Sequence, residues 1–330
     1  THSLFRVPPK AYAIFPLLQK SCSIMFWFHR ESTPETEYPA PPRMPRELER
    51  YIVEMYALES AGPERILQLL PVCHRVRFWL EPALYRTLIL NDGADEQKLP
   101  SCQMDAIERL WTNHPGALQA IVRNVMLIGE TRDTVERVLR SCNSAENVFL
   151  AGCATGGLDL SLLSPSLQRL HCTAETLDLL NWKPGGYTIA SLTHLELFTL
   201  GNRFDRPVSH ALLRLLDRQH FPNLAHLALS ATSVIRSLPE ILPRLRNLKS
   251  LVIVSAYRLV SSTPLSEEDR RILMEHERLV LVSVPDYTED WQDGVLSGND
   301  YWARAERRIS NRLSGVVDAT HYAVNFDELE

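Results

Sequence analysis

The sequence predicts an α/β protein in which a short N-terminal module of three helices precedes an irregular solenoid with a parallel, curved sheet. Two patterns predict this: apolar stretches with helical spacing before residue 85, then a leucine-rich segment that recurs every 22 to 32 residues. The 330 residues are 45% hydrophobic and 23% charged, so the chain can bury a core. This composition excludes collagen-like and wholly disordered chains.

The first 43 residues are expected to form an irregular tail that ends in a proline-rich linker at residues 31–43. The apolar stretch over residues 11–28 is interrupted by Pro16, Gln19 and Lys20. A spanning helix needs about 20 consecutive apolar residues, so no membrane partner is predicted. We therefore expect a cytoplasmic or nuclear protein.

Three short helices and a strand are expected over residues 44–90, because apolar residues recur there at helical spacing. The faces comprise Leu48, Ile52, Met55 and Tyr56 in the first helix, Ile66, Leu67 and Leu70 in the second, and Val72, Val76, Trp79 and Leu80 in the third. Pro71 suits the first turn of the third helix, Pro82 is expected to end it, and a strand follows at residues 85–90. A module of this size cannot bury all of its apolar faces. We therefore expect part of its apolar surface to be covered by a partner.

From about residue 120 the chain repeats the pattern apolar-x-x-apolar-x-apolar, which predicts one short parallel strand per turn of a solenoid. The last positions of the seven copies are Leu127, Leu150, Cys172, Leu197, Leu229, Ile253 and Leu281. Helices are expected between some strands. They include one with Val135, Val138, Leu139 and Cys142 on one face, one behind Pro207, and one that begins with a capping box of Ser266 and Asp269. The arc is expected to extend over residues 91–306, and residues 307–330 to form a C-terminal tail.

Residues 120–285 resemble the leucine-rich-repeat superfamily. The Asn or Cys that commonly follows the last leucine of each repeat by three positions occurs in this chain only as Cys153. Without that side-chain ladder the turns must satisfy their backbone groups differently, so an uneven arc is expected. The alternative is a plain α/β domain with leucine-rich parallel strands.

Residues 44–90 resemble an F-box, through the opening Met44-Pro45-x-Glu47-Leu48, the Leu67-x-x-Leu70 pair, the Val72–Arg77 run and the closing Trp79-Leu80. Together with the repeats, the chain is similar to the F-box-like proteins that fungi carry in large numbers. The C-terminal region echoes an ending of that group, in the residues Trp291, Gly294, Gly298, Asp300, Trp302, Ala305 and Glu306. The alternative is that the helices cap the open end of the solenoid.

The resemblance implies a non-enzymatic subunit of a cullin–RING ubiquitin ligase, which binds a Skp-type adaptor through its helices and a protein target through its repeats. The residues implied in adaptor binding are Pro45, Leu48, Ile52, Leu67, Leu70 and Val72. The alternative function is a leucine-rich-repeat interaction scaffold without a ligase role.

Two columns of side chains should point outward from the repeat strands, because side chains alternate along a strand. The candidate target-binding residues in these columns are Met126, Phe149, Arg169, His194, Glu196 and His226. The alternative is that helices or loops cover the columns, which would make Phe149 and Met126 core residues. His171, His194 and His226 stand on successive repeat strands, but a flat column rarely gives the convergent geometry that a metal needs, so no metal site is expected.

Neither enzyme chemistry nor a cofactor is predicted. The glycine-containing segment at residues 149–157 lacks the G-x-G-x-x-G arrangement of a dinucleotide turn, and G-x-S-x-G, H-E-x-x-H and Walker motifs do not occur. The six cysteines include no C-x-x-C pair, which indicates reduced thiols. A net charge of −5 does not favour nucleic acid as a partner.

Overall fold

The computed structural model describes the chain from Met44 to Val324, apart from residues 59–62, 92–98, 100, 114–115, 154–157, 174–175, 177–187, 199–219, 231–234, 236–237, 245–247, 256–265 and 319. The tail and linker expected before residue 44, most of the expected glycine-containing loop and the helix expected behind Pro207 lie outside the described residues. The described elements belong to one unit of the chain, Arg46–Glu330.

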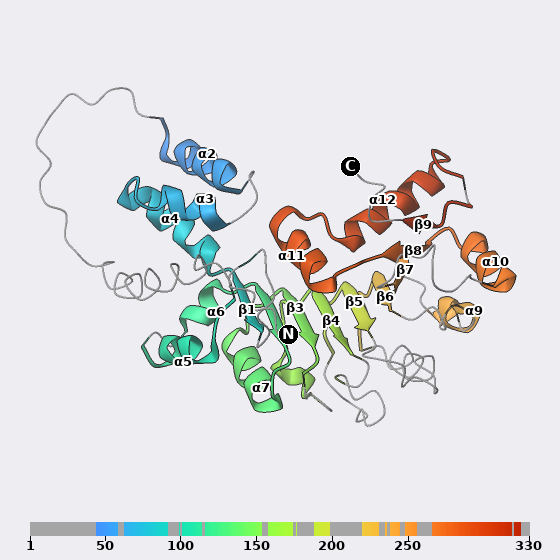
Figure 1. Ribbon diagram of the computed structural model, residues 1–330, viewed down its shortest axis with the longest axis horizontal. Coiled ribbons are helices and arrows are strands. Elements are labelled where there is room, and N and C mark those ends of the chain that lie inside the picture. Colours follow the sequence, from blue (N-terminus) through green and yellow to red (C-terminus); the bar gives the residue numbers. More distant parts are fainter. Residues whose placement is uncertain are drawn as a thin grey trace, which may run out of the picture. The chain divides into compact units, whose positions relative to one another are not determined.

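A single parallel sheet organises the described part of the chain, with nine strands that follow one another in sequence order (Figure 1). The strands are β1 (Thr87–Asn91), β2 (Asn124–Ile128), β3 (Asn147–Ala151), β4 (Arg169–Thr173), β5 (His194–Phe198), β6 (His226–Leu229), β7 (Ser250–Ser255), β8 (Leu279–Ser283) and β9 (Ala323–Val324). The parallel pairing of the seven repeat strands and the strand predicted over residues 85–90 are confirmed. The ninth strand was not predicted.

The strands are paired so that equivalent apolar positions of successive repeats lie side by side. One such row comprises Leu88, Val125, Val148, Leu170, Leu195, Leu227, Leu251 and Leu279. All of these residues belong to the main core, together with buried residues of the connecting helices. The repeat leucines therefore hold one face of the sheet against the helices, as the repeat pattern predicts.

The connecting helices on this face differ in length from repeat to repeat. They are α5 (Met104–Asn113), α6 (Ala117–Ile121), α7 (Arg132–Ser141), the 3-10 helix η3 (Leu160–Leu162), α9 (Leu238–Ile241), the 3-10 helix η5 (Leu242–Arg244) and α10 (Glu267–Glu275). Val135, Val138 and Leu139 are buried on α7, and Ser266 with Asp269 forms the predicted capping box of α10.

The opposite face of the sheet is covered by α11 (Tyr287–Ser297) and α12 (Tyr301–Leu313), which follow β8 (Figure 1). Because α12 continues to Leu313 and β9 pairs with β8, the sheet and its cover extend beyond residue 306. The C-terminal tail expected from residue 307 is therefore replaced, over its described part, by the end of a packed helix and a ninth strand.

The N-terminal module contains α2 (Arg46–Leu58), α3 (Pro63–Leu69) and α4 (His74–Leu84), which pack around Ala57, Ile66, Val76 and Leu80. Pro71 lies in the turn between α3 and α4 and does not open the third helix. Pro82 lies inside α4, which ends only two residues later. A proline is tolerated so near the end of a helix because it removes only a hydrogen bond of the last turn. Among the helices of the described residues, none is both long and apolar enough to cross a bilayer.

The junction between α11 and α12 makes Gly294 a sensitive position. A Cβ added at Gly294 would lie 2.7 Å from Asp300 Cβ. Alanine normally stabilises a helix by about 1 kcal/mol relative to glycine. At Gly294 the overlap with Asp300 should outweigh this gain, so that the substitution destabilises the protein. We expect Gly294→Ala to lower the free energy of unfolding by about 1–3 kcal/mol in urea titrations. Ser310→Ala, at an exposed position of α12, should be neutral or mildly stabilising. A stabilised Gly294→Ala protein would contradict the close packing of the two helices.

Candidate functional site

The sheet face predicted to bind a target is covered by α11 and α12. Met126, Phe149 and Glu196 are almost completely buried, and the side chains of His194 and His226 are mostly buried. Arg169 is half-buried. The predicted columns do point away from the leucine core, but the expected exposure is wrong because the C-terminal helices pack on them. The columns therefore serve as an internal interface.

Aromatic contacts hold α11 against β3. The indole Nε1 of Trp291 donates a hydrogen bond to Asn147 Oδ1 at 3.1 Å. Its ring lies 6.1 Å from that of Phe149, which stacks on Phe198 with centroids 5.5 Å apart. This cluster explains the burial of Met126 and Phe149 as core residues, the alternative that the sequence left open.

Buried charges join α11, α12 and the sheet. Arg304 forms an ion pair with Asp290, whose second carboxylate oxygen accepts a hydrogen bond from the backbone N–H of Tyr301 at 2.8 Å. Burial outweighs the neighbouring guanidinium and raises the pKa of Asp290 to about 6. Asp300 accepts from the Ala303 N–H at the start of α12 and also pairs with Arg169 of β4 at 2.6 Å. The predicted binding residue Arg169 thus anchors the covering helices.

A second buried pair lies beneath α12. His171 Nδ1 is 2.7 Å from Glu196 Oε2, and both side chains are almost completely removed from solvent. The ring of Tyr301 meets His171 edge-on, with centroids 6.5 Å apart. Glu196, which was expected to face a target, therefore satisfies a partner within the protein.

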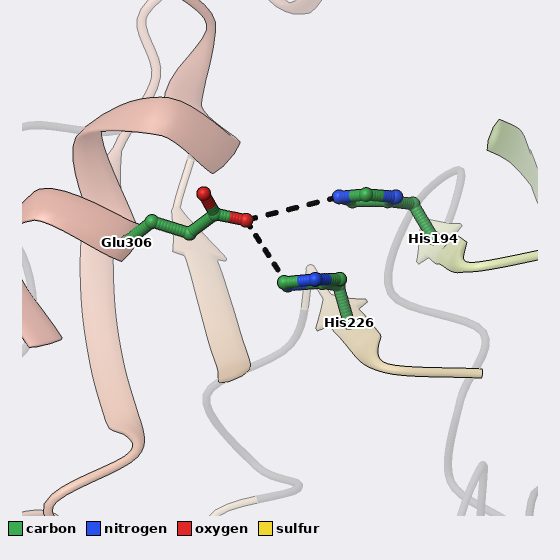
Figure 2. Close-up of side chains that lie close together, drawn as sticks. All are labelled: His194, His226 and Glu306. Carbon is green, nitrogen blue, oxygen red and sulfur yellow. Dashed lines mark ion pairs between the residues drawn. The ribbon is translucent and has the colours of Figure 1, made fainter. Parts of the chain in front are cut away.

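Two histidines and a glutamate converge next to this pair (Figure 2). The rings of His194 and His226 stack with centroids 4.1 Å apart and planes 5° apart. Glu306 Oε1, from α12, lies 3.2 Å from His226 Nδ1 and 3.9 Å from His194 Nε2. Trp302 covers both rings edge-on, at 5.1 and 6.2 Å.

The environment of these histidines keeps them neutral near pH 7. Burial, together with repulsion from His226 and the cationic Arg169, lowers the pKa of His194 to about 2. Burial lowers the pKa of His226 to about 4, with contributions from Lys249 and Arg169. Burial also raises the pKa of the Glu306 carboxyl. The cluster was missed in the sequence because its third member belongs to the covering helix and not to the repeat strands.

The predicted adaptor-binding residues lie just before α2, on α2, on α3 and in the turn before α4. Leu48, Ile52 and Val72 expose 52%, 48% and 65% of their surface. Pro45 is also exposed, whereas Leu67 and Leu70 are half-buried. Further large apolar residues are exposed on the same helices and just before α2, namely Met44, Tyr51, Met55, Tyr56 and Phe78. The module therefore leaves apolar side chains exposed on α2, at Leu48 and Ile52, and in the α3–α4 turn, at Val72; together they are called the open apolar surface.

A groove of about 730 Å³ lies at the amino ends of β1 to β4. Its walls come from α2, α4, the strand ends and the last residues of α11. Among the described residues that line it, the charged ones are Arg50, Glu54, Arg86, Arg123, Glu146 and Arg169. Arg50 pairs with Glu54 at 2.7 Å, Arg123 with Glu146 at 3.4 Å and Arg169 with Asp300 at 2.6 Å. These described charges therefore leave one positive charge in excess, that of Arg86.

Stability should fall at acidic pH through the two histidines. An unfolded histidine takes up a proton near pH 6.5, whereas folded His194 resists protonation down to about pH 2. The unfolded state thus binds more protons below pH 6.5, and stability is lost as the pH falls. Urea titrations between pH 7.5 and 4.5, with a chelator present, should show a slope about 1 kcal/mol per pH unit steeper than in His194→Gln. The opposite contribution of Asp290 is common to both proteins and cancels.

His321→Gln, at an exposed position, is the matched control and should keep the slope of the parent. Parallel curves for the parent and His194→Gln would show that His194 is not shielded from protonation.

Comparisons with known proteins do not assign the chain to a family. No protein-family model and no curated protein matches the sequence. A crystal structure of a protein from Bacteroides fragilis aligns at a TM-score of 0.31 and 15% identity, over 56% of this chain and 69% of the other. A likeness at that TM-score carries no argument, so the site rests on the geometry of this chain.

Proposed function

We propose that the chain is a non-enzymatic recognition subunit of a cullin–RING ubiquitin ligase, which binds a Skp-type adaptor through α2–α4 and a protein target through the remainder of the unit. The observation that carries this proposal is the open apolar surface of Leu48, Ile52 and Val72. The resemblance of residues 44–90 to an F-box indicates that the partner of this surface is a Skp-type adaptor.

The physical argument concerns the size of the module. Among the described residues its own core is small, with Ala57, Ile66, Val76 and Leu80 as the buried apolar side chains. The outward faces of α2 and the α3–α4 turn have no such cover in the described residues, and burying one aliphatic side chain contributes about 1.5–3 kcal/mol. A partner with an apolar groove would gain that energy from Leu48, Ile52 and Val72, as in other helix-in-groove complexes.

The groove at the amino ends of β1 to β4 is the target site in this proposal. The outward columns of the repeat strands are not available to a target, because α11 and α12 cover them. The positive charge that Arg86 adds to the groove favours a protein segment that carries acidic side chains. Arg86 is exposed and Arg123 is half-buried, so both can meet such a segment. Arginines also dominate the energetics of many interfaces.

Adaptor binding can be measured by calorimetry with a purified Skp-type adaptor. Leu48→Asp should weaken binding at least about tenfold, because it places a charge in the apolar contact. Val316→Asp, an equally drastic change at an apolar residue that is 73% exposed and lies after α12, should bind like the parent. Absence of binding by the parent chain would favour the alternative of an interaction scaffold without a ligase role.

Target recognition can be tested with two labelled peptides that differ only in carrying glutamates or lysines. The glutamate peptide should bind more tightly, with an affinity that falls as salt rises. Arg123→Glu should weaken that binding about tenfold or more, whereas Arg140→Glu, an exposed arginine on α7, should not. Equal binding of both peptides would exclude the groove as an acidic-segment site.

A further inference from the structure

The cluster of His194, His226 and Glu306 has the composition of a metal site. One ligand atom from each residue lies within 4.8 Å of the other two. The residues come from β5, β6 and α12, so the strands and the covering helix fix their approach (Figure 2). Two imidazoles and a carboxylate are a ligand set that zinc uses, with a fourth position left to water.

The hydrogen bonds around His194 determine which ring nitrogen is free. The Thr193 hydroxyl donates its proton to the backbone oxygen of Gln168 at 3.1 Å. The same hydroxyl oxygen lies 2.8 Å from His194 Nδ1 and must therefore accept from it. In the neutral ring, Nε2 then carries a lone pair, and this atom is the one that faces Glu306.

A lone pair and a carboxylate that face each other repel unless a positive charge lies between them. A divalent cation would supply that charge, and it would be coordinated through the lone pair of a neutral imidazole. The hydroxyl contact at Nδ1 fixes the orientation of the ring, as outer partners do in metal sites.

The distances from Glu306 are close to those around a small tetrahedral ion, whereas the two stacked rings must tilt toward each other so that both lone pairs point at one ion. Two ligand atoms at about 2.0–2.1 Å from zinc stand about 3.3 Å apart in a tetrahedron. Glu306 Oε1 lies 3.2 Å from His226 Nδ1 and 3.9 Å from His194 Nε2, so shifts of tenths of an ångström suffice for these pairs. The Glu306 side chain is half-exposed and free to adjust. Coordination by His226 Nδ1 would replace its contact with the Ser250 hydroxyl.

We propose that His194 Nε2, His226 Nδ1 and the Glu306 carboxylate bind one zinc ion, which ties α12 to β5 and β6. Nitrogen-rich ligand sets favour zinc, cobalt and nickel over magnesium and calcium. The site shares none of its three ligands with the proposed adaptor and target surfaces and would stabilise the cover of the sheet.

Nearby cations limit the affinity. Arg169 and Lys249 both act on the histidines, although Asp300 at 2.6 Å offsets the charge of Arg169. Lys249 is exposed and can be neutralised without disturbing the core. Lys249→Gln should therefore tighten zinc binding about two- to fivefold at low salt.

The experiment titrates the chelator-treated full chain with zinc by calorimetry and with cobalt by visible absorption. One zinc ion should bind per cluster, with a cobalt spectrum typical of low coordination, and zinc should raise the melting temperature. Glu306→Ala, a change at a half-exposed residue, should weaken zinc binding at least tenfold and abolish the rise in melting temperature. His74→Ala, at an exposed histidine on α4, is the matched control and should bind like the parent.

Binding to the parent and to Glu306→Ala with equal affinity, or an unchanged melting temperature in zinc, would overturn the proposal. His194→Ala supplies a second test if the variant folds. Because adaptor binding is measured separately, failure of the zinc site leaves the function assigned to α2–α4 unaffected, and the reverse also holds.

Discussion

The alignment of the strands in register is the constraint on which the rest of the structure depends. Each strand pairs with the next strand in sequence. The second residue of each of the strands β2 to β7 therefore falls in one apolar row, and the third residue falls in a row on the opposite face of the sheet. The first row is covered by the connecting helices within each repeat. The second row includes Met126, Phe149 and Glu196, and it needs a cover from elsewhere in the chain.

That cover comes from α11 and α12, and polar contacts determine where it lies. Asp300 reaches Arg169 on β4, Trp291 reaches Asn147 on β3, and Glu306 reaches His226 on β6. Hydrophobic packing alone is non-directional, whereas these pairs specify one position for each helix. Trp291, Asp300 and Glu306 near the C-terminal end of the sequence are thus contacts between the cover and the sheet.

The sequence was sufficient for the parallel sheet, because aliphatic residues at a fixed spacing leave few other ways to bury themselves. The capping box at Ser266 is also predictable from the sequence, because it depends on residues three positions apart. The burial of Phe149 is not predictable from the sequence, because its partner Trp291 lies 142 positions away and no local pattern links the two residues. The convergence of Glu306 with His194 was hidden for the same reason. For α2, the helical spacing of apolar residues predicts an apolar face, and the size of the module predicts that part of this face is uncovered. Leu48 and Ile52 are indeed exposed.

The shortness of β9 bears on how the molecule avoids self-association. An edge strand with unpaired backbone groups is a template for joining other chains. In the described part of the chain, Ala323–Val324 pairs with Leu281 and Val282 of β8, so it covers part of that edge with a strand of only two residues. At the other edge, the Cys102 N–H donates to the Ile89 carbonyl of β1 at 2.7 Å and occupies one of its open positions. At both edges of the described sheet, short pairings therefore reduce the number of backbone groups that are open to a strand from another chain.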